Sequence, residues 1–324
     1  MSDVYDAQCL LEAGRIQDGL SLLAQAAGRD DADALNALGH LALAGDFVRR
    51  DLALSRDLFR RAAGAGSIGG AAAFRAFVAN GTGGRADWPA AIRLLAQDSP
   101  RDPSAERELR LIESMQLSGS GEPLDTFAAE RVSESPEVTV FPSLFSDVEC
   151  DFLVEAALPL LQPSKVVDPG TGKLTANPVR TSDAAAFSLV AESPAIHALC
   201  ARLAKASGTN VKQGEPLQVL RYLPGQEYRP HFDALGRTEN QRILTFLVYL
   251  NDRYDGGGTC FMKSGLVVKG RKGDALLFRN ADDSGQLDPN SQHAGEPVKS
   301  GEKFIASRWI RQRALSSDYP SLLS

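Results

Sequence analysis

The first 115 residues of this chain resemble themselves when the sequence is shifted by 36 positions. Residues 22–28 (LLAQAAG) recur as residues 58–64 (LFRRAAG). Further pairs at the same offset are Leu38/Phe74, Leu41/Phe77, Gly45/Gly81, Asp51/Asp87 and Leu58/Leu94. The apolar residues follow helical spacing, and a repeat of this length is typical of stacked helical hairpins. The pattern therefore predicts an α-helical repeat domain over residues 1–115.

From LGHLALAGDFVRRDLALSRDLFRRAAGAG onward, this stretch resembles Sel1-like repeats, which are relatives of the tetratricopeptide (TPR) class. The resemblance covers two good repeats and one shortened repeat. It implies an extended concave surface that binds a partner. A non-repetitive helical bundle is the alternative, because Ala-rich helices resemble one another by chance.

The sequence pattern changes after the repeats. Residues 116–137 (QLSGSGEPLDTFAAERVSESPE) are rich in Ser, Gly, Pro and Glu and are expected to form a linker. A strand and a helix capped by Ser146 follow. From residue 217 onward, at least seven short apolar or alternating stretches are separated by turn residues, which predicts a sandwich, barrel or jelly roll. We expect an α+β protein with a second domain over residues 138–315 and a tail over residues 316–324.

Composition excludes several classes of protein. With 43% hydrophobic and 23% charged residues and a net charge of -6, the chain has no general attraction to nucleic acid or anionic membranes. Its four cysteines are far apart, so neither a disulfide framework nor a cysteine zinc site is predicted. Neither a signal peptide nor a membrane span is evident. We expect a cytoplasmic protein with no nucleic-acid or membrane partner.

A candidate metal site lies in the β region. His231 and Asp233 are two residues apart in EYRPHFDAL, so both side chains project from one face of a strand. His293 follows 62 residues later. Two imidazoles and one carboxylate leave open coordination positions, as in oxygen-activating iron(II) sites. A zinc hydrolase site could use the same residue types, and a surface histidine beside a strand-end aspartate is a further alternative.

Lys303 adds a cation to this pattern. It lies ten residues after His293 and opens the strand KFIASRWIR, in which alternation places Lys303, Trp309 and Arg311 on one face. A lysine that faces inward is unfavourable unless it meets an anion, and a dicarboxylate cosubstrate would supply one. A solvated lysine at the end of the strand is the alternative.

An ordered series of motifs over residues 138–313 resembles the prolyl 4-hydroxylase branch of the 2-oxoglutarate oxygenases. The motifs are VFPSLFSDVECDFLVEAA, PVRTSDAAAF, QVLRYLPGQEYRPHFDA, QRILTFLVYLND, GGGTCF, KGDALLFRN and HAGEPVKSGEKFIASRWIR. The resemblance implies a double-stranded β-helix, a jelly-roll barrel with flanking helices. The chain departs from the family at Met262, where many members have a proline after the phenylalanine. We expect only a local turn difference there.

The resemblance also implies roles for individual residues. The implied catalytic iron ligands are His231, Asp233 and His293. Lys303 pairs with the distal carboxylate of 2-oxoglutarate in this assignment, and Tyr222 and Thr259 match positions that hydrogen-bond it.

Three further positions, Tyr228, Arg242 and Trp309, match residues around a peptide substrate in the family. Core packing is the alternative for Trp309 and for Tyr222. For Arg242 the alternative is a structural ion pair.

The activity implied by the resemblance is hydroxylation of a prolyl or other residue in a peptide or protein. It would use Fe²⁺, 2-oxoglutarate and O₂, release succinate and CO₂, and take ascorbate as a candidate reductant. The repeats would recruit the protein substrate. One alternative is the same chemistry on a free amino acid or a biosynthetic small molecule. Another is a repeat-based scaffold with an inactive barrel, against which the intact ligand set and Lys303 argue.

Overall fold

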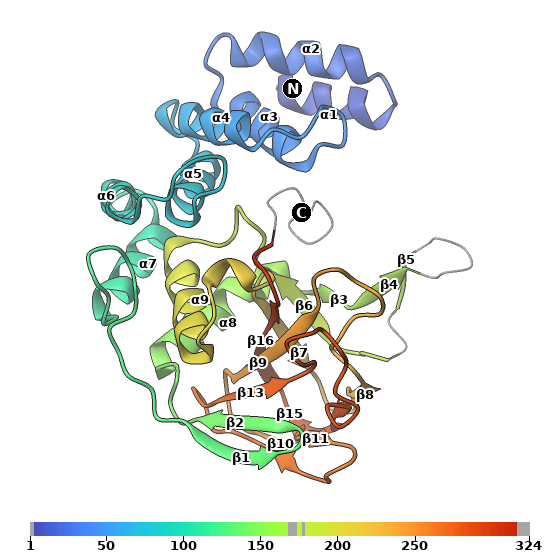
Figure 1. The fold of residues 1–324 in the computed structure, drawn as a ribbon. Helices are drawn as coiled ribbons and strands as arrows, with labels where there is room; N and C mark the ends of the chain where they lie inside the picture. The colour runs from blue at the N-terminus through green and yellow to red at the C-terminus, as the bar shows by residue number, and fades with distance from the viewer. Residues whose placement is uncertain (1–2, 168–173, 177–178, 316–324) are drawn as a thin grey trace. The chain divides into compact units, whose positions relative to one another are not determined.

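The computed structural model describes residues 3–167, 174–176 and 179–315 and divides the chain into two compact units (Figure 1). The helical unit contains the chain up to residue 124 together with residues 188–199. The barrel unit contains residues 125–187 and 200–315. The predicted tail, 316–324, lies outside the described residues. Among the described residues, no helix has the length and apolar character needed to cross a bilayer.

The helical unit is a series of helices in which each one packs against the next. The helices are α1 (Asp3–Glu12), α2 (Ile16–Ala27), α3 (Ala32–Ala44), α4 (Leu52–Gly64), α5 (Ile68–Asn80), α6 (Trp88–Asp98) and α7 (Pro103–Ser114). Helices α2, α4 and α6 begin 36 residues apart, and so do α3 and α5. The predicted helical repeat is therefore confirmed, with the period that the sequence shows.

Repeated cap residues explain why the helices recur at this interval. Asp51 and Asp87 precede α4 and α6, and each carboxylate accepts a hydrogen bond from the backbone N–H three residues later. Gly45 and Gly81 end α3 and α5 with φ of 82° and 81°, a left-handed conformation that favours glycine. The helix boundaries in each repeat are thus set by residues that act locally in the sequence.

Residues 188–199 complete the helical unit although they lie within the predicted second domain. Leu189 and Val190 pack against the buried cluster that contains Phe59 and Phe77. The side chain of Asn80 donates a hydrogen bond to the carbonyl of Leu189 at 3.1 Å. The predicted boundaries require this correction, because apolar side chains in this segment cover the apolar surface of the repeats.

The barrel unit is built from antiparallel sheets. The large sheet has the order β1-β2-β13-β9-β16-β7-β6-β3, and a second sheet has the order β12-β11-β14-β8. The strands of the large sheet are β1 (Glu130–Glu134), β2 (Glu137–Phe141), β3 (Gln162–Pro163), β6 (Asp183–Ala186), β7 (Gln218–Tyr222), β9 (Arg242–Tyr249), β13 (Ala275–Arg279) and β16 (Lys303–Arg311). Those of the second sheet are β8 (Tyr228–His231), β11 (Thr259–Phe261), β12 (Val267–Val268) and β14 (His293–Gly295).

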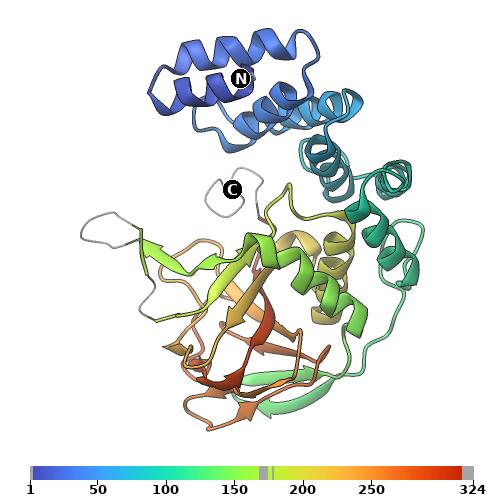
Figure 2. The ribbon, with the colours of Figure 1, turned by 180° about the vertical axis from the view of Figure 1, so that it is seen from behind.

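Two strand pairs and short helical segments complete the unit. The pairs are β4 (Lys165–Val167) with β5 (Leu174–Ala176) and β10 (Tyr254–Gly256) with β15 (Val298–Gly301). The helical segments are α8 (Asp147–Ala157), η1 (Leu158–Leu160), α9 (Pro194–Ser207), in which the boundary between the units falls, and η2 (Val211–Gln213). Figure 2 shows α8 lying across the large sheet, where it contacts β7.

The core of the barrel unit lies between its sheets and confirms the predicted jelly-roll class. Its buried cluster joins Phe261 of β11 to Phe278 of β13 and to Tyr249 of β9. Strand β1 falls within residues 116–137, which were predicted as a linker. The physical reason is that β1 extends the large sheet by pairing with β2 although its own side chains are mostly exposed.

Candidate metal centre

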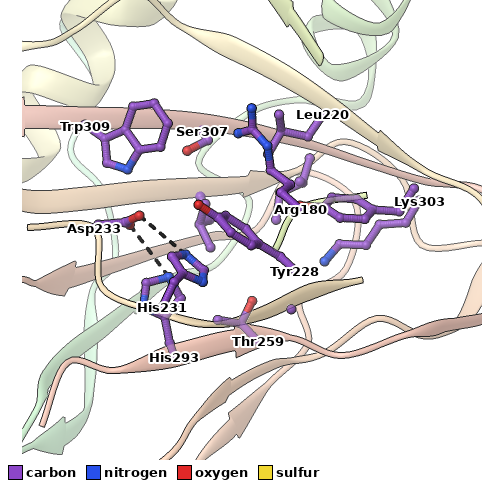
Figure 3. A pocket seen from close by; sticks show the side chains of 14 residues that line it. Arg180, Leu220, Tyr228, His231, Asp233, Thr259, His293, Lys303, Ser307 and Trp309 are labelled. Carbon is purple, nitrogen blue, oxygen red and sulfur yellow. Dashed lines mark ion pairs between the residues drawn. The ribbon is translucent and has the colours of Figure 1, made fainter. Parts of the chain in front are cut away.

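Strand pairing brings the two predicted histidine ligands together. His231 is the last residue of β8, and His293 is the first residue of β14. These strands are antiparallel neighbours, and His231 and His293 are partners in their register. Asp233 lies two residues beyond the end of β8, so it converges with His231 and with the remote His293 at one end of the second sheet (Figure 3).

The three side chains surround a space that is suited to a metal ion. His231 Nε2 lies 3.5 Å from Asp233 Oδ1, and His293 Nε2 lies 3.6 Å from Asp233 Oδ2. One donor atom from each residue can be chosen so that all lie within 4.8 Å of one another. These separations are too long for good hydrogen bonds but are suitable for donor atoms that share a cation.

Hydrogen bonds to backbone carbonyls place a proton on Nδ1 of both imidazoles. His231 Nδ1 lies 2.8 Å from the carbonyl of Arg229, and His293 Nδ1 lies 3.0 Å from that of Ser291. A carbonyl only accepts hydrogen bonds, so each Nδ1 carries a proton, and in the neutral form of each ring the lone pair is on Nε2. The Nε2 atom of His231 is buried and has no hydrogen-bond partner in residues 3–167, 174–176 and 179–315. Burial lowers the pKa of His293, which favours the neutral imidazole that a metal requires.

Asp233 completes the donor set as a buried carboxylate. Burial alone would raise its pKa, but the neighbouring imidazoles and hydrogen bonds, including one from Thr245, hold the pKa well below its usual range. The Thr245 hydroxyl donates to Asp233 Oδ2 at 2.7 Å. Two neutral nitrogen donors and one ionised oxygen donor fit a divalent first-row metal and leave coordination positions for other ligands.

Lys303 supplies a buried cation in the same cavity. Its side chain is almost fully buried, and its Nζ donates to the carbonyl of Gly257 at 2.7 Å. Among the described residues, no carboxylate forms an ion pair with it. Desolvation and the nearby charge of Lys269 lower the pKa of Lys303 to about 8, although Glu296 partly opposes the shift. This end of the cavity therefore favours an anion.

A single cavity joins the metal candidates to Lys303, and all but one of the predicted site residues line it (Figure 3). The predicted residues in its lining are Tyr222, Tyr228, His231, Asp233, Thr259, His293, Lys303 and Trp309. Figure 3 shows the metal candidates at one end and Lys303 toward the other. The arrangement can hold a metal and an anionic ligand side by side.

Two aromatic side chains shape the metal end of the cavity. The ring of Tyr228 stacks on that of His231, with centroids 3.4 Å apart and an interplanar angle of 11°. Burial raises the pKa of Tyr228 to about 12, so its hydroxyl stays protonated at neutral pH. Trp309 lines the cavity, and its indole N–H is buried without a hydrogen-bond partner among the described residues. That N–H is available to a ligand.

Arg242 is the predicted substrate residue that does not line the cavity. Its guanidinium forms two hydrogen bonds with the carboxylate of Glu215, at 2.6 and 2.7 Å, and lies 3.9 Å over the ring of Trp309. Arg311 contacts the same carboxylate at 2.5 Å. The structure thus favours the structural ion pair over the predicted substrate contact, because the buried Glu215 engages both guanidinium groups. The guanidinium of Arg242 thus packs against one face of the Trp309 ring.

Replacing Glu215 by glutamine is expected to reduce the unfolding free energy of the barrel unit by about 3 kcal/mol, because two largely buried guanidinium groups lose their counter-charge. Urea unfolding followed by the fluorescence of Trp309, in a Trp88→Phe background, measures this change. The control is Glu227→Gln, since Glu227 pairs with the exposed Arg229 and should contribute at most about 1 kcal/mol. Equal effects of the two substitutions would contradict the assigned role of Glu215.

Several residues at the site were not predicted. Arg180 and Ser307 also line the cavity, while Thr245 and Asn280 lie behind Asp233. Arg180 lies within the motif PVRTSDAAAF, and Ser307 shares the inward face of Lys303 by alternation. Thr245 and Asn280 could have been noticed as polar residues in the apolar stretches RILTFLVYL and DALLFRN.

Known proteins are similar in sequence to this part of the chain. A family model described as the 2OG-Fe(II) oxygenase superfamily matches residues 217–311, a range that contains every predicted site residue. The chain is 42% identical over 206 residues to prolyl 4-hydroxylase 1 of Arabidopsis thaliana, covering 58% of this chain and 73% of that protein.

Two solved structures were also found. The viral collagen prolyl hydroxylase vCPH from Paramecium Bursaria Chlorella virus-1, in its 2OG complex, has 30% sequence identity and a TM-score of 0.45, covering 56% of this chain and 98% of that chain. A Sel1 repeat protein from Oxalobacter formigenes has 21% identity and a TM-score of 0.31, covering 33% of this chain and 85% of that chain.

Proposed function

The chain belongs to the prolyl 4-hydroxylase family of iron(II)- and 2-oxoglutarate-dependent dioxygenases, and on this basis we propose that it hydroxylates a prolyl residue within a peptide or protein. Fe²⁺, 2-oxoglutarate and O₂ are the cofactor and cosubstrates of this class of enzyme. One observation carries the proposal for this chain. Three convergent metal-binding side chains share a cavity with a buried ammonium group that forms no ion pair with a carboxylate among the described residues.

We assign the iron to Nε2 of His231, Nε2 of His293 and one carboxylate oxygen of Asp233. The hydrogen bonds of both Nδ1 atoms hold each ring in the required tautomer and orientation. Bound iron, together with 2-oxoglutarate and O₂, supplies the oxidising power that converts a C–H bond to C–OH. The protein determines which C–H bond of the substrate lies close to the metal.

We assign the distal carboxylate of 2-oxoglutarate to Lys303. Tyr222 and Thr259 line the same cavity, and Tyr222 pairs with Lys303 in the register of β7 and β16. Burial raises the pKa of Tyr222, so its hydroxyl remains a donor for a carboxylate. The buried surroundings reduce screening by water and strengthen an ion pair at this position.

We assign the prolyl ring of the substrate to the space beside Tyr228 and Trp309. Aromatic faces suit an apolar ring, and the indole N–H of Trp309, which no described residue engages, offers a hydrogen bond to a peptide carbonyl. Arg180 lines the cavity as well and could instead pair with the carboxylate of a free amino acid. The substrate assay must therefore include both kinds of molecule.

We further propose that the helical unit recruits a protein substrate. Stacked helical hairpins build extended surfaces for partners. Part of the apolar surface is covered by Leu189 and Val190, but Phe47, Leu54 and Ile68 remain exposed. These exposed side chains supply apolar area for a partner.

The proposal is tested with the full chain, Fe²⁺, 2-oxoglutarate, ascorbate and O₂. Poly-L-proline, a proline-rich peptide and free L-proline are compared as substrates. We expect the two peptide substrates to gain the mass of one oxygen atom, with succinate formed in equal amount. Conversion of free L-proline alone would overturn the peptide assignment. The absence of succinate under every condition would indicate an inactive barrel.

A further inference from the structure

We propose that Asn280 and Thr245 form a hydrogen-bonded relay that fixes which carboxylate oxygen of Asp233 faces the metal. The side chain of Asn280 donates from Nδ2 to the Thr245 hydroxyl at 2.7 Å, and that hydroxyl donates to Asp233 Oδ2 at 2.7 Å. Both residues act through Asp233 and are positioning residues. This inference rests on the proposed role of Asp233 as a metal ligand.

The direction of the relay follows from the number of protons available. The ionised carboxylate of Asp233 can only accept, so the single hydroxyl proton of Thr245 points to it. The hydroxyl oxygen must then accept from its other neighbour, and the amide nitrogen of Asn280 is the atom that can donate. The negative charge of Asp233 therefore determines which group donates in each of the two hydrogen bonds.

The relay distinguishes the two oxygens of Asp233. Oδ2 accepts the bond from Thr245, whereas Oδ1 has no such donor and lies 3.5 Å from the free Nε2 of His231. Oδ1 thus keeps all its lone pairs for a metal, whereas one lone pair of Oδ2, which lies 3.6 Å from His293 Nε2, is engaged by Thr245. A carboxylate held to one donor atom uses a single coordination position and leaves more positions for a cosubstrate and O₂.

The burial of the relay indicates that its polar groups have a specific role. Thr245 is 1% exposed and Asn280 is fully buried. Within the part of the chain that the structure describes, the amide oxygen of Asn280 has no hydrogen-bond partner, which is unfavourable in the interior. The amide is therefore held in its orientation for the hydrogen bond that it donates.

The backbone of Asn280 supports a second ligand independently of its side chain. Its carbonyl accepts hydrogen bonds from the N–H of Asp288 at 2.9 Å and from the hydroxyl of Ser291 at 3.4 Å. The carbonyl of Ser291 in turn holds Nδ1 of His293. Side-chain substitutions at position 280 leave these backbone contacts available, so they test the link to Asp233 separately.

The test is a titration of the metal-free full chain with Mn²⁺ alone, with free ion measured by electron paramagnetic resonance. Removal of an outer-shell hydrogen bond typically weakens metal binding about 10–100-fold. We expect a loss of this size in Thr245→Val and a loss of about 10-fold in Asn280→Ala, whereas Thr245→Ser keeps the hydroxyl and restores affinity. The double variant should bind no more weakly than Thr245→Val, because Asn280 acts through that hydroxyl.

The control is Asn251→Ala. This amide donates to the carbonyl of Glu302 at 2.7 Å and accepts from the N–H of Phe304 at 2.9 Å, so its loss removes similar bonds without touching a metal candidate. It should lower thermal stability while keeping the affinity for Mn²⁺. If Thr245→Val does not fold, Asn280→Ala and Asn280→Ser, the latter retaining a hydroxyl donor, provide the same comparison.

Two results would overturn the relay. One is unchanged Mn²⁺ affinity in folded Thr245→Val and Asn280→Ala. The other is a double variant whose loss equals the product of the single losses, since that would show that Asn280 acts independently of Thr245. A wild-type chain that binds no Mn²⁺ would instead refute the proposed metal site itself.

Discussion

Replacement of Asp233 by alanine is expected to lower succinate formation by about a thousandfold or more, because metal-assisted steps depend on several kcal/mol of stabilisation and each 1.4 kcal/mol is about a factor of ten. Asp233 is the sole carboxylate of the metal cluster and lies between the two imidazoles. Without it, two neutral nitrogen donors remain for a divalent cation. His293→Ala removes another donor and should have an effect of similar size. Oxygen-dependent succinate formation with added Fe²⁺ measures both.

The matched control is Asp183→Ala. Asp183 is a partly buried carboxylate in the same sheet system, but it pairs with Arg221 at 2.6 Å and does not line the cavity. It should keep turnover close to that of the wild type. Turnover in Asp233→Ala comparable to that of Asp183→Ala would show that the assigned ligand set is wrong.

Replacement of Lys303 by methionine is expected to weaken 2-oxoglutarate binding by about 100–1000-fold, because a buried carboxylate loses a charge partner that contributes about 3–4 kcal/mol. Methionine keeps much of the length of the side chain without its charge. Affinity for Mn²⁺ without cosubstrate should change little, since Lys303 is not a metal candidate. Calorimetric titration with 2-oxoglutarate in the presence of Mn²⁺, without O₂, provides the measurement. Lys299→Met, at an exposed position of β15, is the control and should bind normally.

The same interaction predicts the pH dependence of cosubstrate affinity. The pKa of Lys303 in the free protein is lowered to about 8, so the ammonium form predominates below that pH and is lost as the pH rises through it. Affinity for the dianion should therefore be highest below pH 8 and should decline above it. The decline should be absent in Lys303→Met. A pH profile shared by wild type and Lys303→Met would contradict the pairing of this ammonium with the cosubstrate.

The features predicted from the sequence are those encoded by local spacing or by ordered motifs. The helical repeats follow from cap residues such as Asp51 and Gly45, which act within one turn of the chain. The proximity of His231 and Asp233 follows from a separation of two residues. His293 was assigned by its place in the motif series, and the register of β8 and β14 confirms that it lies opposite His231.

The features that were not predicted depend on contacts between remote residues. Arg242 is engaged by Glu215, which lies 27 positions earlier in the chain. Asn280 reaches Asp233 only through Thr245, and no pattern of spacing joins those three positions. Strand β1 has mostly exposed side chains, so its composition is like that of a linker although its backbone pairs with β2.

The contribution of residues 188–199 to the helical unit limits how freely this protein can be divided. A fragment that lacked the repeats would leave Leu189 and Val190 without the apolar cluster that covers them. It would also remove Glu108, whose carboxylate accepts the backbone N–H of Ala195 at 2.8 Å near the start of α9. Truncation at residue 124 would therefore cut through the helical unit, which includes residues 188–199. Removing either segment of the helical unit would expose apolar side chains that the other segment covers.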